Sequence, residues 1–265
     1  MPGTPFVLIA PGATRGLGLA LTRHYLRTTS LPVFATHRRA SNQDGKIKEL
    51  VLSPLQDVDP RRLGLLHLDL CSESSIESAA DRLYESLGTH GADLPYIHTA
   101  FLTGGTLTPE RKPSELDWGS MKATFQINVI SHMLLIKHFS RFLPDRTRKD
   151  VDSFSKWVHV SARVGSISDN KLGGWYSYRS SKAALNQVVK TFDLHLEQQN
   201  MPAMSIGVHP GTVQTDLSKA FWNSTPSEKL FEPDFAACKL ADVVQNISIE
   251  QRGRVWDWSG REVPR

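Results

Sequence analysis

The sequence predicts an α/β fold in which helices cover both faces of a parallel, doubly wound sheet of about seven strands. Short β-branched or apolar runs alternate with longer segments of helical periodicity, which is the rhythm of βαβ units. Several of the runs are apolar almost without interruption, as strands buried on both faces are. A chain of 265 residues with 40% hydrophobic and 22% charged residues can fill a sizeable core, so we expect one domain over residues 1–265.

Each expected element is defined by one of these runs. The expected strands are Phe6–Ala10, Pro32–Thr36, Leu63–Leu68, Tyr96–Ala100, Trp157–Ser161, Ala203–Val208 and Gly253–Trp256. Three-to-four-residue apolar spacing predicts helices at Gly16–Ser30, Ser74–Leu87, Leu116–Leu143, Tyr176–Glu197 and Asp234–Ile249. The charged and polar segment Pro144–Ser155 is expected to be a surface loop.

One segment, Gln214–Pro233, has no clear period although Phe221 and Trp222 lie within it. A loop of this length inside a compact domain is usually functional, so it is a candidate lid over a binding site. A second small helical layer with buried aromatic side chains fits the same pattern, and both interpretations stay open.

Composition bounds the class of protein. The formal net charge of +4 is spread along the chain without a basic block, which favours a mildly basic enzyme over a nucleic-acid-binding protein. The ten histidines show no metal-ligand spacing, and Cys71 and Cys238 are expected to be reduced, buried thiols. The first residues have no basic n-region, and no apolar run approaches a membrane span, so we expect a cytoplasmic protein that binds neither membrane nor nucleic acid.

A glycine-rich loop follows the first expected strand and opens a helix. Its glycines, at positions 12, 16 and 18, have the spacing G-x-x-x-G-x-G. Glycine permits the tight turn and lets the backbone approach a pyrophosphate at the helix N-terminus. The sequence therefore predicts a dinucleotide site at this loop.

The end of the second strand indicates which dinucleotide is bound. It reads Ala35-Thr-His-Arg-Arg39, without the carboxylate that usually holds the ribose hydroxyls of NAD. Arg38, Arg39 and the loop residue Arg15 suit a 2′-phosphate instead, so NADP(H) is preferred, although the two strand-end arginines could also be solvated charges. Asp69, after the third strand, could accept a bond from the adenine amino group or cap the following helix.

Tyr178 and Lys182 lie four residues apart and should share one face of a helix, whereas Tyr176 faces elsewhere. A phenol has a pKa of ~10, and lowering it by about three units requires ~4 kcal/mol. One ammonium at roughly 4–5 Å supplies ~3–4 kcal/mol in an effective dielectric of about 20. We therefore expect Lys182 to lower the pKa of Tyr178 and suit it to acid–base catalysis.

With these motifs in order, the sequence resembles the short-chain dehydrogenases/reductases over essentially its whole length, which implies a Rossmann-type fold. The insert RVGSISDNKLGGWYSYRSSKAALN and the ending GRVWDWSGREVP are similar to the subgroup around the bacterial C-signal protein. The matching residues are Gly12, Gly16, Gly18, Asp69, Asn128, Tyr178, Lys182 and Pro210–Thr215.

The resemblance implies NADP-linked hydride transfer to or from a carbonyl carbon. In that scheme Tyr178 gives the carbonyl oxygen its proton, and Lys182 lowers the Tyr178 pKa and binds the nicotinamide ribose. Asn128 holds a water in a proton relay, and Pro210–Thr215 line the nicotinamide end. Members commonly form homodimers or homotetramers through the helices that correspond to Leu116–Leu143 and Tyr176–Glu197.

Three departures from the family pattern stand out. Pro11 replaces the usual threonine of the glycine loop and removes a hydroxyl and an N–H. Phe101 replaces a glycine and is expected to place its ring beside the cofactor ribose. Ala162 stands where the catalytic serine is expected, so either Ser161 substitutes or the hydroxyl is missing, and Ser166 and Tyr176 are further candidates to reach the oxygen.

The predicted function is an NADP(H)-dependent oxidoreductase acting on a carbonyl, alcohol or imine of a small-to-medium apolar substrate. The alternative is a protein that keeps the fold and cofactor site but has reduced or non-redox activity, as Ala162 suggests. The expected catalytic residues are Tyr178, Lys182, Asn128 and Ser161. The expected cofactor-binding residues are Gly12, Thr14, Arg15, Gly16, Leu17, Gly18, His37, Arg38, Asp69, Leu70, Ala100, Tyr178, Lys182, Pro210, Gly211, Val213 and Thr215.

Overall fold

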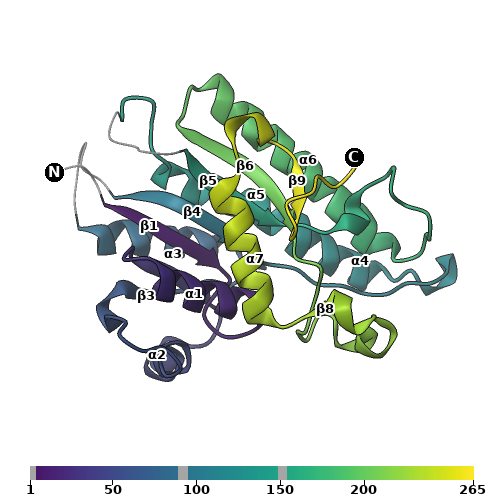
Figure 1. Ribbon diagram of the computed structural model, residues 1–265, viewed down its shortest axis with the longest axis horizontal. Coiled ribbons are helices and arrows are strands. Elements are labelled where there is room, and N and C mark those ends of the chain that lie inside the picture. The colour runs from purple at the N-terminus through teal and green to yellow at the C-terminus, as the bar shows by residue number, and fades with distance from the viewer. Residues whose placement is uncertain (1–3, 89–94, 149–153) are drawn as a thin grey trace.

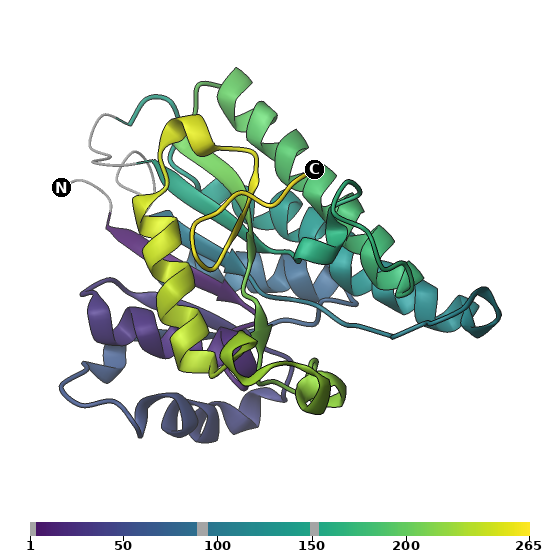
Figure 2. The same cartoon turned by 45° about the vertical axis from the view of Figure 1, so that its right-hand side comes forward.

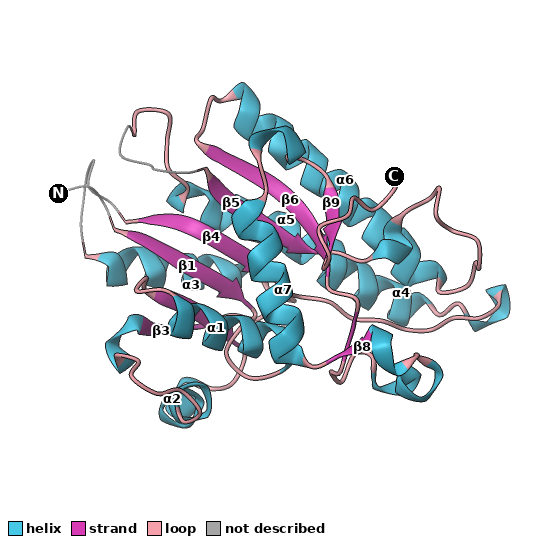
Figure 3. Ribbon diagram, viewed as in Figure 1, coloured by secondary structure: helices cyan, strands magenta, loops and turns pink. Residues whose placement is uncertain are grey.

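The computed structural model describes residues 4–88, 95–148 and 154–265. A seven-stranded sheet forms its centre, with the strand order β3-β2-β1-β4-β5-β6-β9 and parallel pairing throughout (Figures 1 and 3). This order confirms the predicted doubly wound sheet. The strands are β1 (Pro5–Ala10), β2 (Val33–His37), β3 (Leu63–His67), β4 (Tyr96–Leu102), β5 (Ser155–Val160), β6 (Ala203–His209) and β9 (Val255–Asp257).

Two helical layers cover the sheet, and the side chains of β1 show why its sequence is apolar throughout. Val7 and Ile9 pack with α1 (Gly16–Thr28), α2 (Asp44–Leu52) and α7 (Pro233–Asn246). Phe6 and Leu8, which alternate with them, pack with α3 (Glu73–Leu87), α5 (Ser131–Phe139) and α6 (Tyr176–Gln198). Figure 2 shows α7 (yellow-green) lying across one face of the sheet, and α6 (green) running from the top towards the right-hand side.

The long helix predicted at Leu116–Leu143 is interrupted in the middle. It consists of α4 (Trp118–Phe125), a π-helical segment (Gln126–Ile130) and α5, followed by a 3₁₀ turn. π-helical segments inside helices often mark functional sites, and this one contains Asn128. The helix α2 was not predicted, because its apolar stripe is narrow: only Ile47 and Val51 are buried along it.

Two further expectations need correction or restriction. Cys71 and Cys238 are free, as expected, but both are exposed, so the prediction of buried thiols is wrong. Cys71 lies just before the start of α3, and Cys238 lies on an exposed position of α7. The predicted loop Pro144–Ser155 falls partly on residues 149–153, which lie outside the described residues.

The unpatterned segment Gln214–Pro233 folds into short pieces. It contains 3₁₀ turns at Lys219–Ser224 and Ser227–Lys229, and β8 (Leu230–Phe231), which pairs with β7 (Thr212–Val213). Ser218 organises it: its hydroxyl donates to the Val213 carbonyl and accepts a bond of 2.9 Å from Trp222 Nε1. Side-chain hydrogen bonds therefore replace helical periodicity as the source of local order.

One ion pair fixes α6 against the sheet. Arg252 Nε lies 2.9 Å from Oδ1 of Asp193, whose side chain is completely buried. The same carboxylate oxygen accepts a 3.0 Å bond from the Ser205 N–H on β6. Since α6 carries Tyr178 and Lys182, this pair positions the candidate catalytic helix relative to the sheet.

Removing Arg252 should leave the buried Asp193 carboxylate without its ion-pair partner. Arg252→Ala is expected to lower the free energy of unfolding by about 3–5 kcal/mol, the usual result of breaking a buried pair from one side. Guanidinium unfolding followed by far-UV circular dichroism measures the change. Arg61→Ala is the matched control, because the Arg61–Asp59 pair is exposed and its loss should leave stability almost unchanged. Equal effects of the two variants would contradict a locking role for Asp193.

Candidate functional site

The candidate site lies at the carboxyl edge of the sheet, where the loops after β1, β4, β5 and β6 converge. The chain order reverses between β1 and β4, which is where open α/β sheets form a ligand crevice. Two glycines show how closely these loops approach one another. A Cβ atom placed on Gly16 would lie 3.2 Å from the Thr215 side chain, and a Cβ atom placed on Gly105 would lie 3.7 Å from Lys182 Nζ. The structure therefore brings the predicted residues of four loops together.

The glycine loop leaves the N-terminus of α1 free for an anion. The N-cap residue Arg15 makes no side-chain capping bond, and the first turn of α1 contains no acidic residue. Gly16 has φ +57, and a side chain on Gly18 would clash with the Pro11 carbonyl. Uncapped N–H groups and a glycine cradle fit the pyrophosphate of a dinucleotide.

The predicted phosphate-binding residues differ in how they present their side chains. Arg38 and Arg39 are exposed at the end of β2. Arg15 is exposed too, and its Nη1 lies 3.0 Å from Asp216 Oδ2 in the segment after β7. The imidazole of His37 is buried instead, with Nε2 3.1 Å from Asp44 Oδ1, so it does not join the exposed arginines.

The residues after β3 and within β4 form the neighbouring wall. Asp69 Oδ1 accepts a 2.9 Å bond from the Cys71 N–H, whereas the N-cap of α3 is Ser72. The interpretation of Asp69 as the helix cap is therefore wrong. The Leu70 side chain approaches Gly104, and Ala100 is completely buried within β4.

Tyr178 and Lys182 lie on the buried face of α6, as their spacing predicts. Their side chains are 7% and 2% exposed, respectively, and Lys182 Nζ lies 5.8 Å from the Tyr178 ring centroid. The ammonium donates a 2.9 Å bond to the Val160 carbonyl at the end of β5. The Lys182 amine thus lies at the end of β5, with the Tyr178 ring close to it.

Burial shifts the pKa values of both Tyr178 and Lys182, and the direction for Tyr178 differs from the one expected from the sequence. It raises the pKa of Tyr178 above its usual value and lowers the pKa of Lys182 to about 7. The Tyr178 pKa therefore moves in the direction opposite to the predicted one, because burial removes water from both groups and disfavours the charged form of each. Tyr178 is held in its protonated form, the form that can donate a proton.

Asn128 uses its whole side chain as a clamp. Its Oδ1 accepts a 2.8 Å bond from the Thr106 N–H, and its Nδ2 donates to the Thr106 carbonyl and to Ser181 Oγ, each at 2.9 Å. The residue joins the loop after β4 to α6, close to Lys182. A relay water on this side chain would have to share these bonds.

The structure shows where the serine hydroxyls near Ala162 point. Ser161 is buried, and its Oγ donates a 2.6 Å bond to Asn186 Oδ1 on α6. Ala162, at the expected serine position, has extended backbone and a buried methyl group. The Ser166 hydroxyl accepts a 3.1 Å bond from the Asp169 N–H and donates to the Arg265 carbonyl. Both serine hydroxyls are thus engaged with other partners.

The other two departures are absorbed by the fold. Phe101 is fully buried and its ring lies 5.8 Å from that of Tyr25 on α1, so the expectation of a ring beside the cofactor ribose is wrong. β4 continues to Leu102, which turns Phe101 into a core residue. The Thr103 hydroxyl donates to the Pro11 carbonyl and ties the glycine loop to β4.

Aromatic packing beside Tyr178 was seen only partly in the sequence. The Trp175 ring lies 6.1 Å from Tyr178 and 4.8 Å from Phe221, in the predicted lid. Glu110, which carries no sequence signal, is buried and accepts bonds from the Ser177 hydroxyl and, at 3.3 Å, the Ser177 N–H. This carboxylate caps α6 and fixes the start of the helix that bears Tyr178.

A second missed feature is a pair of buried histidines, His132 on α5 and His159 on β5. Their Nδ1 atoms are 2.9 Å apart, and both side chains are fully buried. His132 follows Asn128 by one helical turn, but nothing in the sequence indicates that β5 would place a second imidazole against it.

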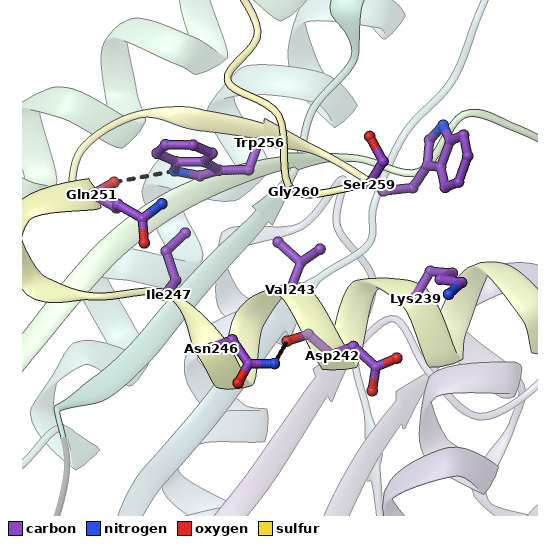
Figure 4. Close-up of a pocket in the computed structure, with 10 residues that line it drawn as sticks. Lys239, Asp242, Val243, Asn246, Ile247, Gln251, Trp256, Ser259 and Gly260 are labelled. Carbon is purple, nitrogen blue, oxygen red and sulfur yellow. Dashed lines mark hydrogen bonds between the residues drawn. The ribbon is translucent and has the colours of Figure 1, made fainter.

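A further groove lies away from the predicted catalytic residues. A groove of about 420 Å³ separates α7 from the segment around β9 and is lined by residues such as Asp242, Trp256 and Trp258 (Figure 4). None of the predicted catalytic residues lines it. In residues 4–88, 95–148 and 154–265 we find no cluster of three potential metal ligands. Within the same ranges, no helix has the length and apolarity to cross a membrane.

The buried histidines should make stability depend on pH. Burial lowers the pKa of His132 to about 3 and that of His159 well below its usual value. On acidification below about pH 6.5, both histidines therefore bind protons in the unfolded chain but not in the folded protein. Stability should be full above about pH 6.5 and should fall on acidification, by up to about 1.4 kcal/mol per pH unit for each histidine. Urea unfolding between pH 7.5 and 4.5 measures this.

His195→Gln serves as the control, because His195 is exposed on α6. The control should keep the wild-type slope, whereas replacement of His132 and His159 should make it shallower, with His209 and the other histidines of lowered pKa supplying what remains. A wild-type profile that is flat below pH 6.5 would contradict the neutral, buried pair.

Comparisons with known proteins agree with this geometry. The family model "short chain dehydrogenase" matches residues 6–225. The C-signal protein of Myxococcus xanthus is 33% identical over 150 residues, covering 57% of this chain and 81% of that one. The 1-hydroxy-2-glutathionyl-2-methyl-3-butene dehydrogenase of Rhodococcus sp. (strain AD45) is 31% identical over 188 residues, covering 71% and 74%.

Solved structures share the fold over the whole chain. NADPH-bound carbonyl reductase from chicken fatty liver superposes with a TM-score of 0.82 at 23% identity, covering 99% of this chain and 100% of that one. An NADP-bound short-chain dehydrogenase/reductase of Burkholderia multivorans gives 0.75 at 25% identity, with both chains fully covered. The matched family model, the motifs and the strand order lead to one conclusion: the chain belongs to the short-chain dehydrogenase/reductase family.

Proposed function

We propose that the protein is an NADP(H)-dependent oxidoreductase that transfers hydride between nicotinamide and a carbonyl, alcohol or imine carbon. The observation that carries the proposal is the buried Tyr178–Lys182 pair at the carboxyl edge of the sheet, beside an uncapped glycine loop. A buried, strongly perturbed pair of titratable groups at such an edge is typical of a catalytic site.

NADP(H) is proposed as the cofactor. The α1 N-terminus would hold the pyrophosphate, and Arg15, Arg38 and Arg39 would bind the 2′-phosphate through charge-assisted bonds. Two structural neighbours are described as holding NADPH or NADP, which supports the same choice. When bound, the nicotinamide supplies or accepts the hydride; the protein supplies position, protons and a dry site.

The acid–base roles follow from the two perturbed acidities. A phenol whose pKa is raised by burial stays protonated and can donate to the developing alkoxide, so the free protein is prepared for carbonyl reduction. Lys182, held by the Val160 carbonyl, would place its positive charge beside that oxygen and bind the ribose. Asn128 would act through the loop that it holds at Thr106.

The proposed substrate is small to medium and apolar. Trp175 and Phe221 form an aromatic wall beside Tyr178, and Leu217 lies near Gly105 above Lys182. A benzil reductase of Bacillus subtilis, 23% identical over 264 residues, acts by its name on an aromatic diketone. That relative is in keeping with an apolar carbonyl substrate. The segment 214–233 would act as the lid.

Ala162 favours a second candidate, a protein with reduced or non-redox activity. Loss of one oxyanion donor typically costs about 100- to 1000-fold in rate. Ser161 would replace this donor only if its hydroxyl left Asn186 to reach a carbonyl oxygen. An imine that already carries a proton would not need this donor.

We also propose a cytoplasmic homo-oligomer. On the outer side of α4 and α5, Trp118 is 75% exposed, and Ile130 and Met133 are nearly half exposed, which suits a subunit contact. Two free, exposed cysteines suit a reducing compartment.

Replacing the phenol tests the proposed function. Tyr178→Phe is expected to lower kcat for NADPH-dependent reduction of apolar aldehydes and ketones by about 100- to 10,000-fold, the usual contribution of a general acid. NADPH consumption at a panel of carbonyls is measured, with NADH as the cofactor control. NADPH binding by fluorescence titration should persist, because the phosphate contacts are unchanged. Unaltered consumption by the variant would refute the mechanism, and absence of consumption by wild type with intact binding would favour the second candidate.

Restoring the serine tests the meaning of Ala162. Ala162→Ser should raise kcat for ketones, with a ceiling of about 100- to 1000-fold, because it returns a donor to the developing oxyanion. Ser161→Ala is the matched variant, and its hydroxyl is already bound to Asn186, so it should change kcat less than about tenfold. A large loss in Ser161→Ala together with no gain in Ala162→Ser would show that Ser161 does the work instead.

A further inference from the structure

A histidine pair lies behind the candidate active site, on elements that also carry site residues. His132 follows Asn128 by four residues, and His159 precedes Val160, whose carbonyl binds Lys182. Both imidazoles are fully buried, their Nδ1 atoms are 2.9 Å apart, and His132 Nε2 lies 3.1 Å from the Gly104 carbonyl oxygen.

These contacts fix the tautomers of both rings. A carbonyl oxygen only accepts, so His132 Nε2 must carry the hydrogen and donate it to Gly104. A neutral His132 then has a bare Nδ1, and His159 must donate its Nδ1 hydrogen to it. His159 Nε2 is left as a buried acceptor without a partner. The pair is therefore a directed chain, from His159 through His132 to the main chain at Gly104.

The chain ends on the segment that covers Lys182. Asn128 holds Thr106 through both its N–H and its carbonyl, and His132 holds Gly104. Between these two anchors lies Gly105, where a side-chain carbon would be 3.7 Å from Lys182 Nζ. Two side chains, one helical turn apart, thus fasten Gly104–Thr106 beside the catalytic amine.

We propose that His132 and His159 are positioning residues that keep the segment Gly104–Thr106 closed over Lys182 and so keep water from its amine. His132 makes the anchoring bond, and His159 fixes the tautomer that allows it. The importance of this arrangement for turnover rests on the catalytic role proposed above for Lys182, whereas the closure itself does not.

The groups around Lys182 explain why closure matters. The titratable side chains that interact with it are Tyr178 on its own helix, His132 on α5, His159 on β5 and His209 on β6. All three imidazoles are neutral near pH 7, so none of them offsets the cost of burying the ammonium. Water admitted by an open segment would relieve that cost and raise the pKa of Lys182 from about 7 towards its ordinary value.

Two substitutions of one residue separate closure from general packing. His132→Gln can place an amide nitrogen near the Nε2 position and keep the bond to Gly104, but it loses the partner of His159. His132→Asn can place its amide near the Nδ1 position and keep His159, but it loses Gly104. Hydrogen exchange of peptides that contain residues 103–107 should rise about tenfold or more in His132→Asn and less than about threefold in His132→Gln.

The second member of the pair has its own matched variants. His159→Asn can still donate to His132 Nδ1 and should keep the segment protected. His159→Leu removes the donor that fixes the tautomer, so exchange at 103–107 should rise as in His132→Asn. Leu135→Ala, on the same face of α5, controls for lost stability, because it opens a cavity in the core without touching Gly104.

Turnover gives the second readout. The pH at which kcat/KM falls on the alkaline side reports the pKa of Lys182 in the free enzyme. This midpoint should move up by about one pH unit in His132→Asn. It should stay near its wild-type value in His132→Gln and in Leu135→Ala. Equal exchange at 103–107 in His132→Asn and His132→Gln would overturn the proposal whatever the activity. Rapid exchange in His132→Asn without a shift in the high-pH fall of kcat/KM would show that the histidine pair holds the segment in place but does not affect the pKa of Lys182. Absence of turnover in wild type would refute the proposed function, and the exchange comparison would still decide on closure.

Discussion

The burial of Lys182 is the constraint on which the candidate site depends. The residue is 2% exposed, and its amine donates a 2.9 Å hydrogen bond to the Val160 carbonyl. A cation in such a place loses hydration that no carboxylate returns, so its pKa falls to about 7. Proton transfer near neutrality then needs no unusual side chain. In the proposed mechanism it needs a site that stays dry, which the surrounding loops would provide.

The loops stay in place through buried hydrogen bonds, since they have no helical or strand periodicity of their own. Glu110 caps α6 at Ser177, and Asn128 fastens Thr106. Ser218 folds the predicted lid, whose Phe221 packs on Trp175 beside Tyr178. Glu110 and Asn128 join segments that are far apart in sequence, whereas the Ser218 bonds are local. These anchors tie the loops of the site to α6 and to the segment around Asn128.

Departures from the family pattern had different outcomes once the chain was folded. Phe101 became a core residue because β4 runs two residues further than expected, so its ring leaves the cofactor side. Ala162 remains a real loss, because the neighbouring hydroxyl of Ser161 is bound to Asn186. The first departure is a matter of packing, and the second concerns chemistry. Only the second bears on which substrates the protein would reduce.

The sequence by itself determined the order of strands and helices, the glycine loop and the shared face of Tyr178 and Lys182, because these are local periodicities and fixed spacings. It missed α2, where the apolar stripe is narrow, and the π-helical segment around Asn128, which has no pattern of its own. Tertiary structure decided the direction of each hydroxyl, the contact of His132 with His159, and the pKa values of Tyr178 and Lys182. All three features depend on which distant groups come into contact and on how much water those groups exclude. The spacing of residues along the sequence predicts neither of these.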